Sequence, residues 1–377
     1  MASTGIRSFS PPARVLMGPG PSDVHPRVLA AMARPTIGHL DPAFVGMMDE
    51  LQELMRAAFR TRNEFTLPIS APGSAGMEAC FANLVEPGDV VVVGRNGVFG
   101  ERMRQNVELM GGEAVLVDAP WGRAIDPDDL RRALAARPEA RLVAFVQAET
   151  STGALSDARA LCAIAREHDC LTIVDAVTSL GGVPLQVDDW QIDAVYSGSQ
   201  KCLSCPPGLS PLSFSARAMA RIRARTSPCR SWFLDASLLA GYWHGAARRT
   251  YHHTAPVNAL YGLHEALLML VEEEGLEVAW ARHQRNHLAL ATGLAELGLE
   301  LVVPAAERLP PLNAVAIPAG VDDATVRRRL LEDWGIEIGA GLGELAGRVW
   351  RIGLMGQSSS PRHVRVLLAA LQTVLAG

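Results

Sequence analysis

Residues 171–201 read LTIVDAVTSLGGVPLQVDDWQIDAVYSGSQK, and this stretch decides the fold. Two apolar runs, 171–174 and 194–196, contain β-branched residues, are bordered by turn residues and are too short for typical helices, which favours buried strands. Asp175 ends the first run, and Lys201 follows the second run after a polar turn. Because parallel strands of an open sheet place their carboxyl ends at the ligand crevice, we expect both side chains to lie there.

The pair formed by Asp175 and Lys201 predicts a cofactor. Taken singly, each side chain is more often half of an ordinary ion pair. Together they point to pyridoxal 5'-phosphate (PLP), which needs a lysine for its Schiff base and an acidic partner for its pyridinium nitrogen. The small residues at 197–199 would let the backbone approach this cofactor closely.

The composition is that of an ordinary globular enzyme, with 377 residues, 49% of them hydrophobic and 20% charged. The length suggests two domains, and the net charge of -5 gives no reason to expect nucleic acid binding. We find no apolar stretch of membrane-helix length, no signal core and no peroxisomal address, so we expect a cytoplasmic protein without membrane contact. The six cysteines do not form a disulfide scaffold, and no histidine set completes a metal site around Cys202 and Cys205.

Strand and helix patterns alternate from about residue 65 to about residue 215. This alternation is typical of an α/β fold with a mainly parallel sheet covered by helices on both faces. From about residue 275 a long helix is followed by short strands and helices, which indicates a smaller α+β domain. We therefore predict an N-terminal arm at 1–17, a large cofactor-binding domain at 18–273 and a small C-terminal domain at 274–377.

Three strand ends of the predicted large domain carry candidate cofactor contacts. The strand at 65–70 runs into the small-residue turn 71–76, before a helix expected from Met77, and such a turn favours an anion such as phosphate. Phe99 follows another strand and could lie flat on a cofactor ring, although an aromatic there is more often core filler. The hydroxyls at 150–152 could bind a phenolate or phosphate oxygen, or could act as turn and cap residues.

Two further segments are candidates for contact with the substrate. Arg351 lies within a predicted strand, where it could bind a carboxylate through two N–H groups or form a structural ion pair. The stiff turn 16–21 could carry backbone close to a ligand, or be a plain surface turn. We also expect a strand at 299–303 and a loop at the glycine-rich 339–343, which lacks the spacing of a dinucleotide fingerprint.

The chain resembles the class V PLP-dependent aminotransferases, and within them the alanine–glyoxylate / serine–pyruvate aminotransferase family. The resemblance extends from about Leu16 to near the C-terminus and rests on several long, ordered matches. They are Met17-Gly18-Pro19-Gly20-Pro21-Ser22, Val174-Asp175-Ala176, Tyr196-Ser197-Gly198-Ser199-Gln200-Lys201, Tyr251-His252-His253-Thr254 and Arg351-Ile352-Gly353-Leu354. It implies the aspartate aminotransferase fold (fold type I) and the transfer of an amino group from alanine or serine to glyoxylate or pyruvate.

The resemblance also implies residue roles. Lys201 would form the Schiff base, Asp175 would pair with the pyridinium and Phe99 would cover the ring. Arg351 would bind the substrate carboxylate, with Gly20 at the substrate. The matches to the remaining cofactor positions are Gly73, Ser74 and Gln200 at the phosphate, Thr150 at the phenolic oxygen, and Tyr251 and Thr254 at the phosphate of a neighbouring subunit, which implies a homodimer with shared active sites.

The sequence departs from the family pattern at the ring aromatic and at the phosphate turn. The ring aromatic is often tryptophan but is Phe99 here, and the turn often reads Ser-Gly-Ser-Gly-His but is Ser70-Ala71-Pro72-Gly73-Ser74. Other readings stay open: a pyridoxamine–pyruvate or 2-aminoethylphosphonate–pyruvate aminotransferase, a PLP lyase such as a cysteine desulfurase, or a PLP-binding protein without catalysis. A desulfurase carries its nucleophilic cysteine late in the chain, whereas the last cysteine here is Cys229.

Overall fold

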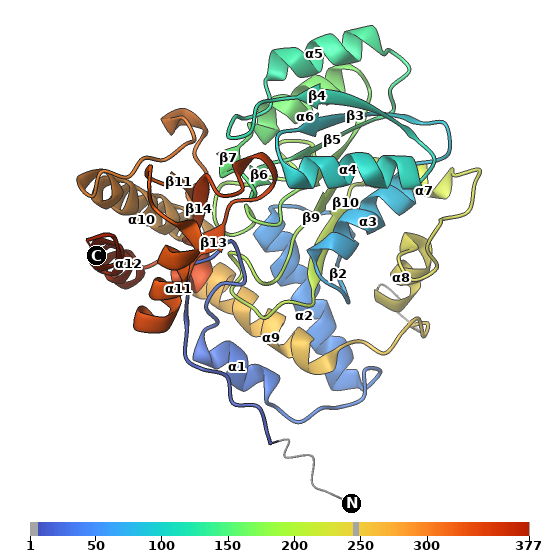
Figure 1. Cartoon of the computed structure of the whole chain (residues 1–377). Helices are drawn as coiled ribbons and strands as arrows, with labels where there is room; N and C mark the ends of the chain where they lie inside the picture. The colour runs from blue at the N-terminus through green and yellow to red at the C-terminus, as the bar shows by residue number, and fades with distance from the viewer. Residues whose placement is uncertain (1–6, 244–248, 377) are drawn as a thin grey trace, which may run out of the picture.

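The computed structural model describes residues 7–243 and 249–376 and has an α/β architecture with two large hydrophobic cores (Figure 1). The larger part is built on a seven-stranded sheet with strand order β2-β10-β9-β8-β5-β3-β4. In that order the strands span Phe65–Ile69, Ser210–Phe214, Ala194–Tyr196, Leu171–Asp175, Leu142–Val146, Val90–Arg95 and Glu113–Asp118. Only β10 pairs antiparallel to its neighbours in this sheet, which confirms the predicted, mainly parallel arrangement.

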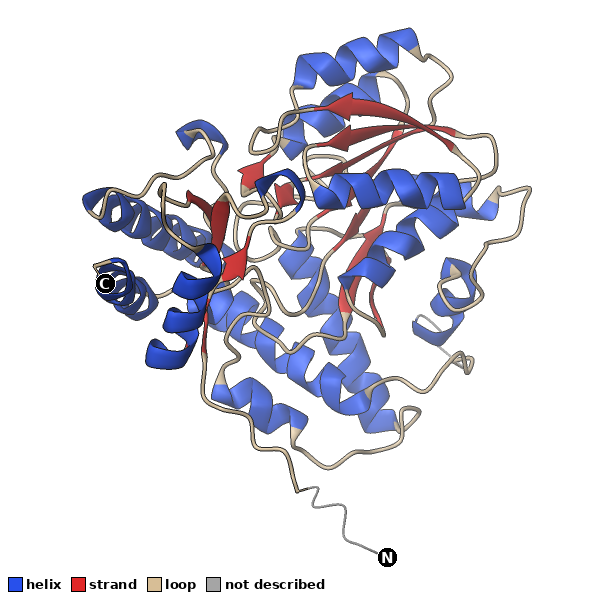
Figure 2. Ribbon diagram, viewed as in Figure 1, coloured by secondary structure: helices blue, strands red, loops and turns tan. Residues whose placement is uncertain are grey.

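Helices cover both faces of this sheet, and in Figure 1 strands β3, β4 and β5 lie between α4 on one side and α5 and α6 on the other (Figures 1 and 2). Because both faces are covered, every residue of β5 and of β8 is buried. The helices of this part are α1 Pro26–Met32, α2 Pro42–Phe59, α3 Gly73–Leu84, α4 Val98–Leu109, α5 Pro127–Ala136, α6 Ala158–Glu167, α7 Ala216–Arg223, α8 Ala236–Trp243 and α9 Val257–Leu268.

The helix starts differ in how their free N–H groups are satisfied. Asp126 and Asp157 cap α5 and α6 through their side chains, as such residues commonly do. Helices α3 and α4 begin after Pro72 and Gly97 without a side-chain cap from these residues. Helix α3 also begins at Gly73, four residues before the predicted Met77, because the small residues after Pro72 continue directly into the first turn.

The C-terminal part has its own core around a three-stranded sheet of order β11-β14-β13, which spans Leu312–Ala316, Val349–Gly353 and Gly339–Ala340. The prediction of a loop at 339–343 was therefore wrong at β13, and the predicted strand at 299–303 is reduced to an isolated bridge at Leu301. The α-helices here are α10 Leu276–Glu296, α11 Asp323–Trp334 and α12 Pro361–Leu375. A π-helix, η1 Met269–Glu274, precedes α10, and the short 3-10 helices are η2 Ala305–Glu307, η3 Gly343–Leu345 and η4 Gly356–Ser358.

The N-terminal segment is tied to this C-terminal part. Strand β1, Val15–Leu16, pairs in parallel with β12, Ile336–Glu337, and Met17 is fully buried in the same core. The chain then crosses to the large sheet, so the turn after Met17 lies between the two parts. The domain limits themselves stay a prediction. No helix within the described residues combines the length and the hydrophobicity needed to cross a membrane.

Candidate active site

The site forms at the carboxyl ends of β8 and β9, as the sequence predicted. Asp175 is the last residue of β8 and lies in register with Tyr196, the last residue of β9. Lys201 lies in the turn that follows β9 and is only partly accessible. The parallel pairing of these two strands brings the acid, the phenol and the amine to one edge of the sheet.

Asp175 is buried, and both carboxylate oxygens accept a hydrogen bond. The backbone N–H of Val177 donates to Oδ1 at 2.8 Å, and the hydroxyl of Tyr196 donates to Oδ2 at 2.7 Å. Burial raises the pKa of Asp175 to about 7, against the lowering effect of these two hydrogen bonds, and the charge of Glu149 raises it further. A buried carboxylate held in this way is stabilised by a cation placed next to it.

Lys201 is held in a weakly solvated position, and burial lowers the pKa of its amine to about 8, with a further contribution from the charge of Arg351. Its Nζ donates a hydrogen bond to the carbonyl of Pro19. Gly20 has a φ of +106°, and a Cβ there would lie 2.5 Å from the lysine Nζ. The turn 16–21 therefore lies against Lys201, and its position favours the ligand contact over the plain surface turn.

The first turn of α3 lies beside the loop that follows β9. Gly73 is buried, Ser74 is exposed, and neither Pro72 nor another N-cap side chain covers the start of the helix. The Oε1 atom of Gln200 is buried and has no hydrogen-bond partner within the described residues. Next to these residues, the hydroxyl of Ser70 lies 2.7 Å from Nε2 of His253.

Phe99 and Thr150 occupy the neighbouring strand ends. Phe99 lies in the first turn of α4, half-buried, and the guanidinium carbon of Arg102 lies 4.9 Å from its ring centroid. Thr150 is buried in the turn between β6, Ala148–Glu149, and β7, Ala154–Leu155, and its Oγ1 lies 2.9 Å from Oγ1 of Thr178.

Arg351 approaches the site from β14. Its Nε donates to the carbonyl of Ala340 at 2.7 Å, and its Nη1 donates to the carbonyl of Thr150 at 3.2 Å. The residue is only 7% exposed, and no salt bridge joins it to a carboxylate in the part of the chain that the structure describes. Burial lowers its pKa, which the charge of Glu149 opposes. Of the two roles predicted for Arg351, the structure therefore favours binding of an anionic ligand over a structural ion pair.

Tyr251 and Thr254 are exposed, as Ser74 is, whereas the remaining candidates are buried or half-buried. Tyr251 is 66% exposed, and its ring centroid lies 5.6 Å from that of His39. No hydrogen bond recorded among the described residues joins either side chain to Lys201 or to Asp175. Within one chain the structure does not bring them to the site.

The family model for class V aminotransferases matches residues 20–350 of this chain. The chain belongs to this family. It is 41% identical to an alanine–glyoxylate aminotransferase of Drosophila melanogaster, with 97% of this chain and 93% of the relative covered. It is 39% identical to a (S)-ureidoglycine–glyoxylate transaminase of Bacillus subtilis, with 99% and 93% covered.

Solved structures show the same relationship. An alanine–glyoxylate aminotransferase from Nostoc sp. is 46% identical, has a TM-score of 0.95 and covers 98% of this chain and 97% of its own. A pyridoxamine–pyruvate aminotransferase from Mesorhizobium loti is 29% identical, with a TM-score of 0.90 and coverage of 96% and 92%. A NifS-like protein at 16% identity, TM-score 0.74, shares the fold alone. These findings confirm the predicted family, the PLP-dependent transferase fold and the aminotransferase activity.

Class V aminotransferases use PLP as their cofactor. The residues of the candidate active site fit this cofactor. Asp175 offers a buried carboxylate that forms no salt bridge within the described residues, and Lys201 offers a desolvated amine. The uncapped first turn of α3 leaves backbone N–H donors for a phosphate, and the unpartnered Oε1 of Gln200 can accept a hydrogen bond from a donor of the bound cofactor or from water. Within the described residues, no group of three or more His, Cys, Asp or Glu side chains is arranged to hold a metal.

Sequence reasoning missed two residues of this class V aminotransferase, Tyr196 and Glu149. Tyr196 was part of a recognised stretch, and its place at the end of β9 opposite Asp175 was the signal that could have identified it. Glu149, next to the hydroxyls at 150–152, was given no role, although it is fully buried. Nothing in the local sequence indicates that this carboxylate points inward.

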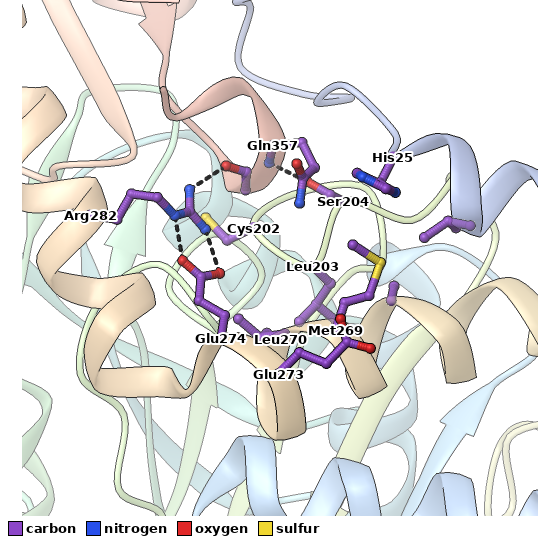
Figure 3. Close-up of a pocket in the computed structure, with 13 residues that line it drawn as sticks. His25, Cys202, Leu203, Ser204, Met269, Leu270, Glu273, Glu274, Arg282 and Gln357 are labelled. Carbon is purple, nitrogen blue, oxygen red and sulfur yellow. Dashed lines mark hydrogen bonds and ion pairs between the residues drawn. The ribbon is translucent and has the colours of Figure 1, made fainter. Parts of the chain in front are cut away.

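A separate cavity of about 270 Å³ lies next to the lysine loop, beside Cys202, Leu203 and Ser204 (Figure 3). Figure 3 shows the paired Arg282 and Glu274 beside Cys202, and Arg282 Nε donates to Glu274 Oε1 at 2.5 Å. Cys202 is buried, and its Sγ donates to the carbonyl of Thr178 at 3.2 Å, so this side chain packs against the turn that follows β8.

Proposed function

We propose that this class V aminotransferase moves the amino group of a small amino acid, alanine or serine, to glyoxylate or pyruvate. The observation that carries the proposal is the buried guanidinium of Arg351, which pairs with no carboxylate among the described residues and whose charge acts on Lys201. An amino acid and a 2-oxo acid both bring a carboxylate that an arginine binds through two N–H groups. The alanine–glyoxylate relatives support this substrate class.

The proposed roles follow from the geometry. PLP, when bound, supplies an electron sink for the charge that develops on the substrate Cα. Asp175 holds a proton on the pyridinium nitrogen, which requires the ionised carboxylate that Tyr196 and Val177 stabilise. Lys201, with a pKa near 8, is partly neutral around neutral pH and accepts and returns the Cα proton as general base and acid.

The remaining contacts belong to cofactor binding in the same proposal. Phe99 covers one face of the ring, and Thr150 lies near the phenolic oxygen. Gly73, Ser74 and Gln200 surround the phosphate, and Gly20 borders the substrate. The exposed Tyr251 and Thr254 reach the phosphate of a second subunit, so we propose a homodimer with shared sites. Six free cysteines support a cytoplasmic location.

A second candidate donor is (S)-ureidoglycine, which the likeness to the Bacillus subtilis transaminase favours. This molecule carries a carboxylate and an amine, as alanine does, and so fits the same Arg351 and Lys201. The two donors differ in the side group on Cα, and the pocket that receives this group decides between them.

The test is a single-turnover experiment on the PLP-loaded enzyme, without any oxo acid, against alanine, serine, (S)-ureidoglycine, pyridoxamine and 2-aminoethylphosphonate. Conversion of the lysine-bound cofactor absorbance to that of pyridoxamine phosphate by alanine or serine supports the proposal. Conversion by ureidoglycine alone would move the donor to the second candidate. A reaction only with pyridoxamine or the phosphonate, neither of which has the carboxylate, would overturn the role of Arg351.

A further inference from the structure

Glu149 is a fully buried carboxylate that the proposed function leaves without a role. Its Oε2 accepts hydrogen bonds from the backbone N–H groups of Phe99 at 3.2 Å and Gly100 at 3.4 Å. Its Oε1 accepts from the backbone N–H of Ser151 at 3.0 Å and from the hydroxyl of Ser151 at 2.5 Å. Burial raises the pKa of Glu149, and these four hydrogen bonds oppose that rise, because each of them favours the ionised carboxylate.

These bonds connect two segments that are far apart in the sequence. Helix α4 has no side-chain cap of its own, and Glu149 supplies the cap from the β6 strand, while Ser151 Oγ accepts from the N–H of Val98 at 3.0 Å. The backbone of Gly97 lies against Glu149, because a Cβ there would lie 2.5 Å from its Cγ and Cδ. A carboxylate at a helix N-terminus is favoured by the free N–H groups and by the helix dipole.

The two segments carry different parts of the active site. The start of α4 carries Phe99. The β6–β7 turn carries Thr150, whose carbonyl accepts a hydrogen bond from Arg351. The charge of Glu149 also acts on Arg351, whose protonated form it favours, and on Asp175, whose ionised form it disfavours. Glu149 is thus bonded to both segments and coupled to two charged groups of the site.

We propose that Glu149 is a positioning residue that holds the Phe99 ring and the Arg351 guanidinium in one fixed arrangement. It holds the first turn of α4 against the β6–β7 turn. The same side chain therefore positions both Phe99, which covers the cofactor ring, and Arg351, which binds the substrate carboxylate. The inference rests on the proposed roles of Phe99 and Arg351. It adds that these roles depend on a buried anion that touches neither the cofactor nor the substrate.

The test uses Glu149→Gln, which keeps the shape of the side chain. Glutamine has only one acceptor oxygen, so its NH2 group must face an N–H donor where the second carboxylate oxygen accepted a hydrogen bond. Glu101→Gln is the matched control, because Glu101 lies on the same helix and pairs with Arg95 and Arg104 instead. The first readout is hydrogen–deuterium exchange of the peptide 98–102 in the apo-protein, which needs no cofactor. The others are the Kd for PLP, the visible circular dichroism of the bound cofactor, and KM and kcat for the amino donor.

We expect Glu149→Gln to speed hydrogen exchange in 98–102 about tenfold. We also expect the Kd for PLP and the KM for the amino donor to rise about tenfold each. Each change is the size expected from the loss of one charge-assisted hydrogen bond. The dichroic band of the bound cofactor will decrease, since the ring is held less uniformly. Glu101→Gln will leave the Kd for PLP, the dichroic band, KM and kcat at wild-type values.

A Glu149→Gln enzyme with wild-type exchange, Kd and dichroism would overturn the proposal, as would a fall in melting temperature without any change in these readouts. Gly97→Ala is the second variant, because its Cβ displaces Glu149 without removing it. The roles of Phe99 and Arg351 are tested separately by Phe99→Ala and Arg351→Lys. If these two variants keep wild-type PLP affinity and KM, the proposed function fails; if they lose them while Glu149→Gln does not, only this inference fails.

Discussion

Replacement of Tyr196 by phenylalanine tests the electrostatics of the Asp175 site directly. The Tyr196 hydroxyl donates to the buried carboxylate at 2.7 Å, and this bond favours the ionised form. Phenylalanine keeps the ring that fills the core and removes only the donor. The pKa of Asp175 must then rise, because burial keeps its raising effect while one of the two lowering hydrogen bonds is lost.

The size of the effect follows from the strength of the bond. A hydrogen bond to a charged group contributes about 1.5–3 kcal/mol, which corresponds to about one to two pKa units. The pKa of Asp175, about 7 in the wild-type chain, would move to roughly 8–9. At about pH 7 the fraction of ionised Asp175 falls by roughly 5- to 50-fold, and the affinity for PLP falls with it, since the pyridinium needs the anion.

The assay is a titration of the apo-protein with PLP, followed through the absorbance of the lysine-bound cofactor, at about pH 7 and about pH 9.5. Above the shifted pKa both proteins have an ionised Asp175, so the ratio of the two Kd values will approach one at the higher pH. Tyr261→Phe is the control, because its hydroxyl contacts only the carbonyl of Pro35, at 3.4 Å. A Tyr196→Phe protein with wild-type affinity at both values, or with the same loss at both, would refute the reasoning.

Four further variants test single groups of the site. Lys201→Ala will abolish the lysine-bound cofactor absorbance and nearly all turnover; wild-type turnover would contradict the scheme. Arg351→Lys keeps the charge but loses the two-pronged donor, so KM for the amino donor will rise about 10- to 100-fold with a smaller change in kcat, whereas a fall in kcat alone would argue against carboxylate binding. Wild-type Asp175 has a folded pKa near 7 and an unfolded value near 3.8, so the folded apo-protein holds a proton that the unfolded chain has lost. The stability of the apo-protein therefore falls as the pH rises from about 4 to about 7, and Asp175→Asn will lose this slope in urea unfolding; an unchanged slope would be evidence against it. Ser70→Ala will weaken PLP binding by roughly fivefold and will not add to His253→Ala in a double-mutant cycle, because the two side chains share one hydrogen bond; additive losses would disprove the coupling.

The strand ends were predictable because their signals are local. A short apolar run bordered by turn residues indicates a buried strand wherever it packs, and the polar residue after it must lie at the sheet edge. Asp175 and Lys201 were found in this way. Phe99 and Arg351 were candidates from their positions near predicted strands, and the family resemblance added Gln200; the structure brings Arg351 close enough to Lys201 to act on its pKa.

The local sequence gave wrong predictions for two segments whose strand pairing depends on residues far away in the chain. The glycine-rich 339–343 was expected to be a loop, but its first two residues form β13 because β14 offers its edge to them. The apolar 299–303 was expected to be a strand, but it makes only one bridge to β11. Both segments lie outside the strand–helix alternation of residues 65–215, so the edge that a neighbouring strand offers decides whether they pair.

The sequence by itself determined the α/β class, the alternation of strands and helices between about residues 65 and 215, and the positions of Asp175 and Lys201 beside strand ends, because each depends on periodicity and on residues next to a strand end. Tertiary structure alone decided which groups these residues meet. The register of β8 and β9 gives Asp175 its hydroxyl donor from Tyr196, and the turn after β6 buries Glu149 against the start of α4. Burial and partner choice set the charge state of each group, and both arise from contacts between segments separated by tens to hundreds of residues.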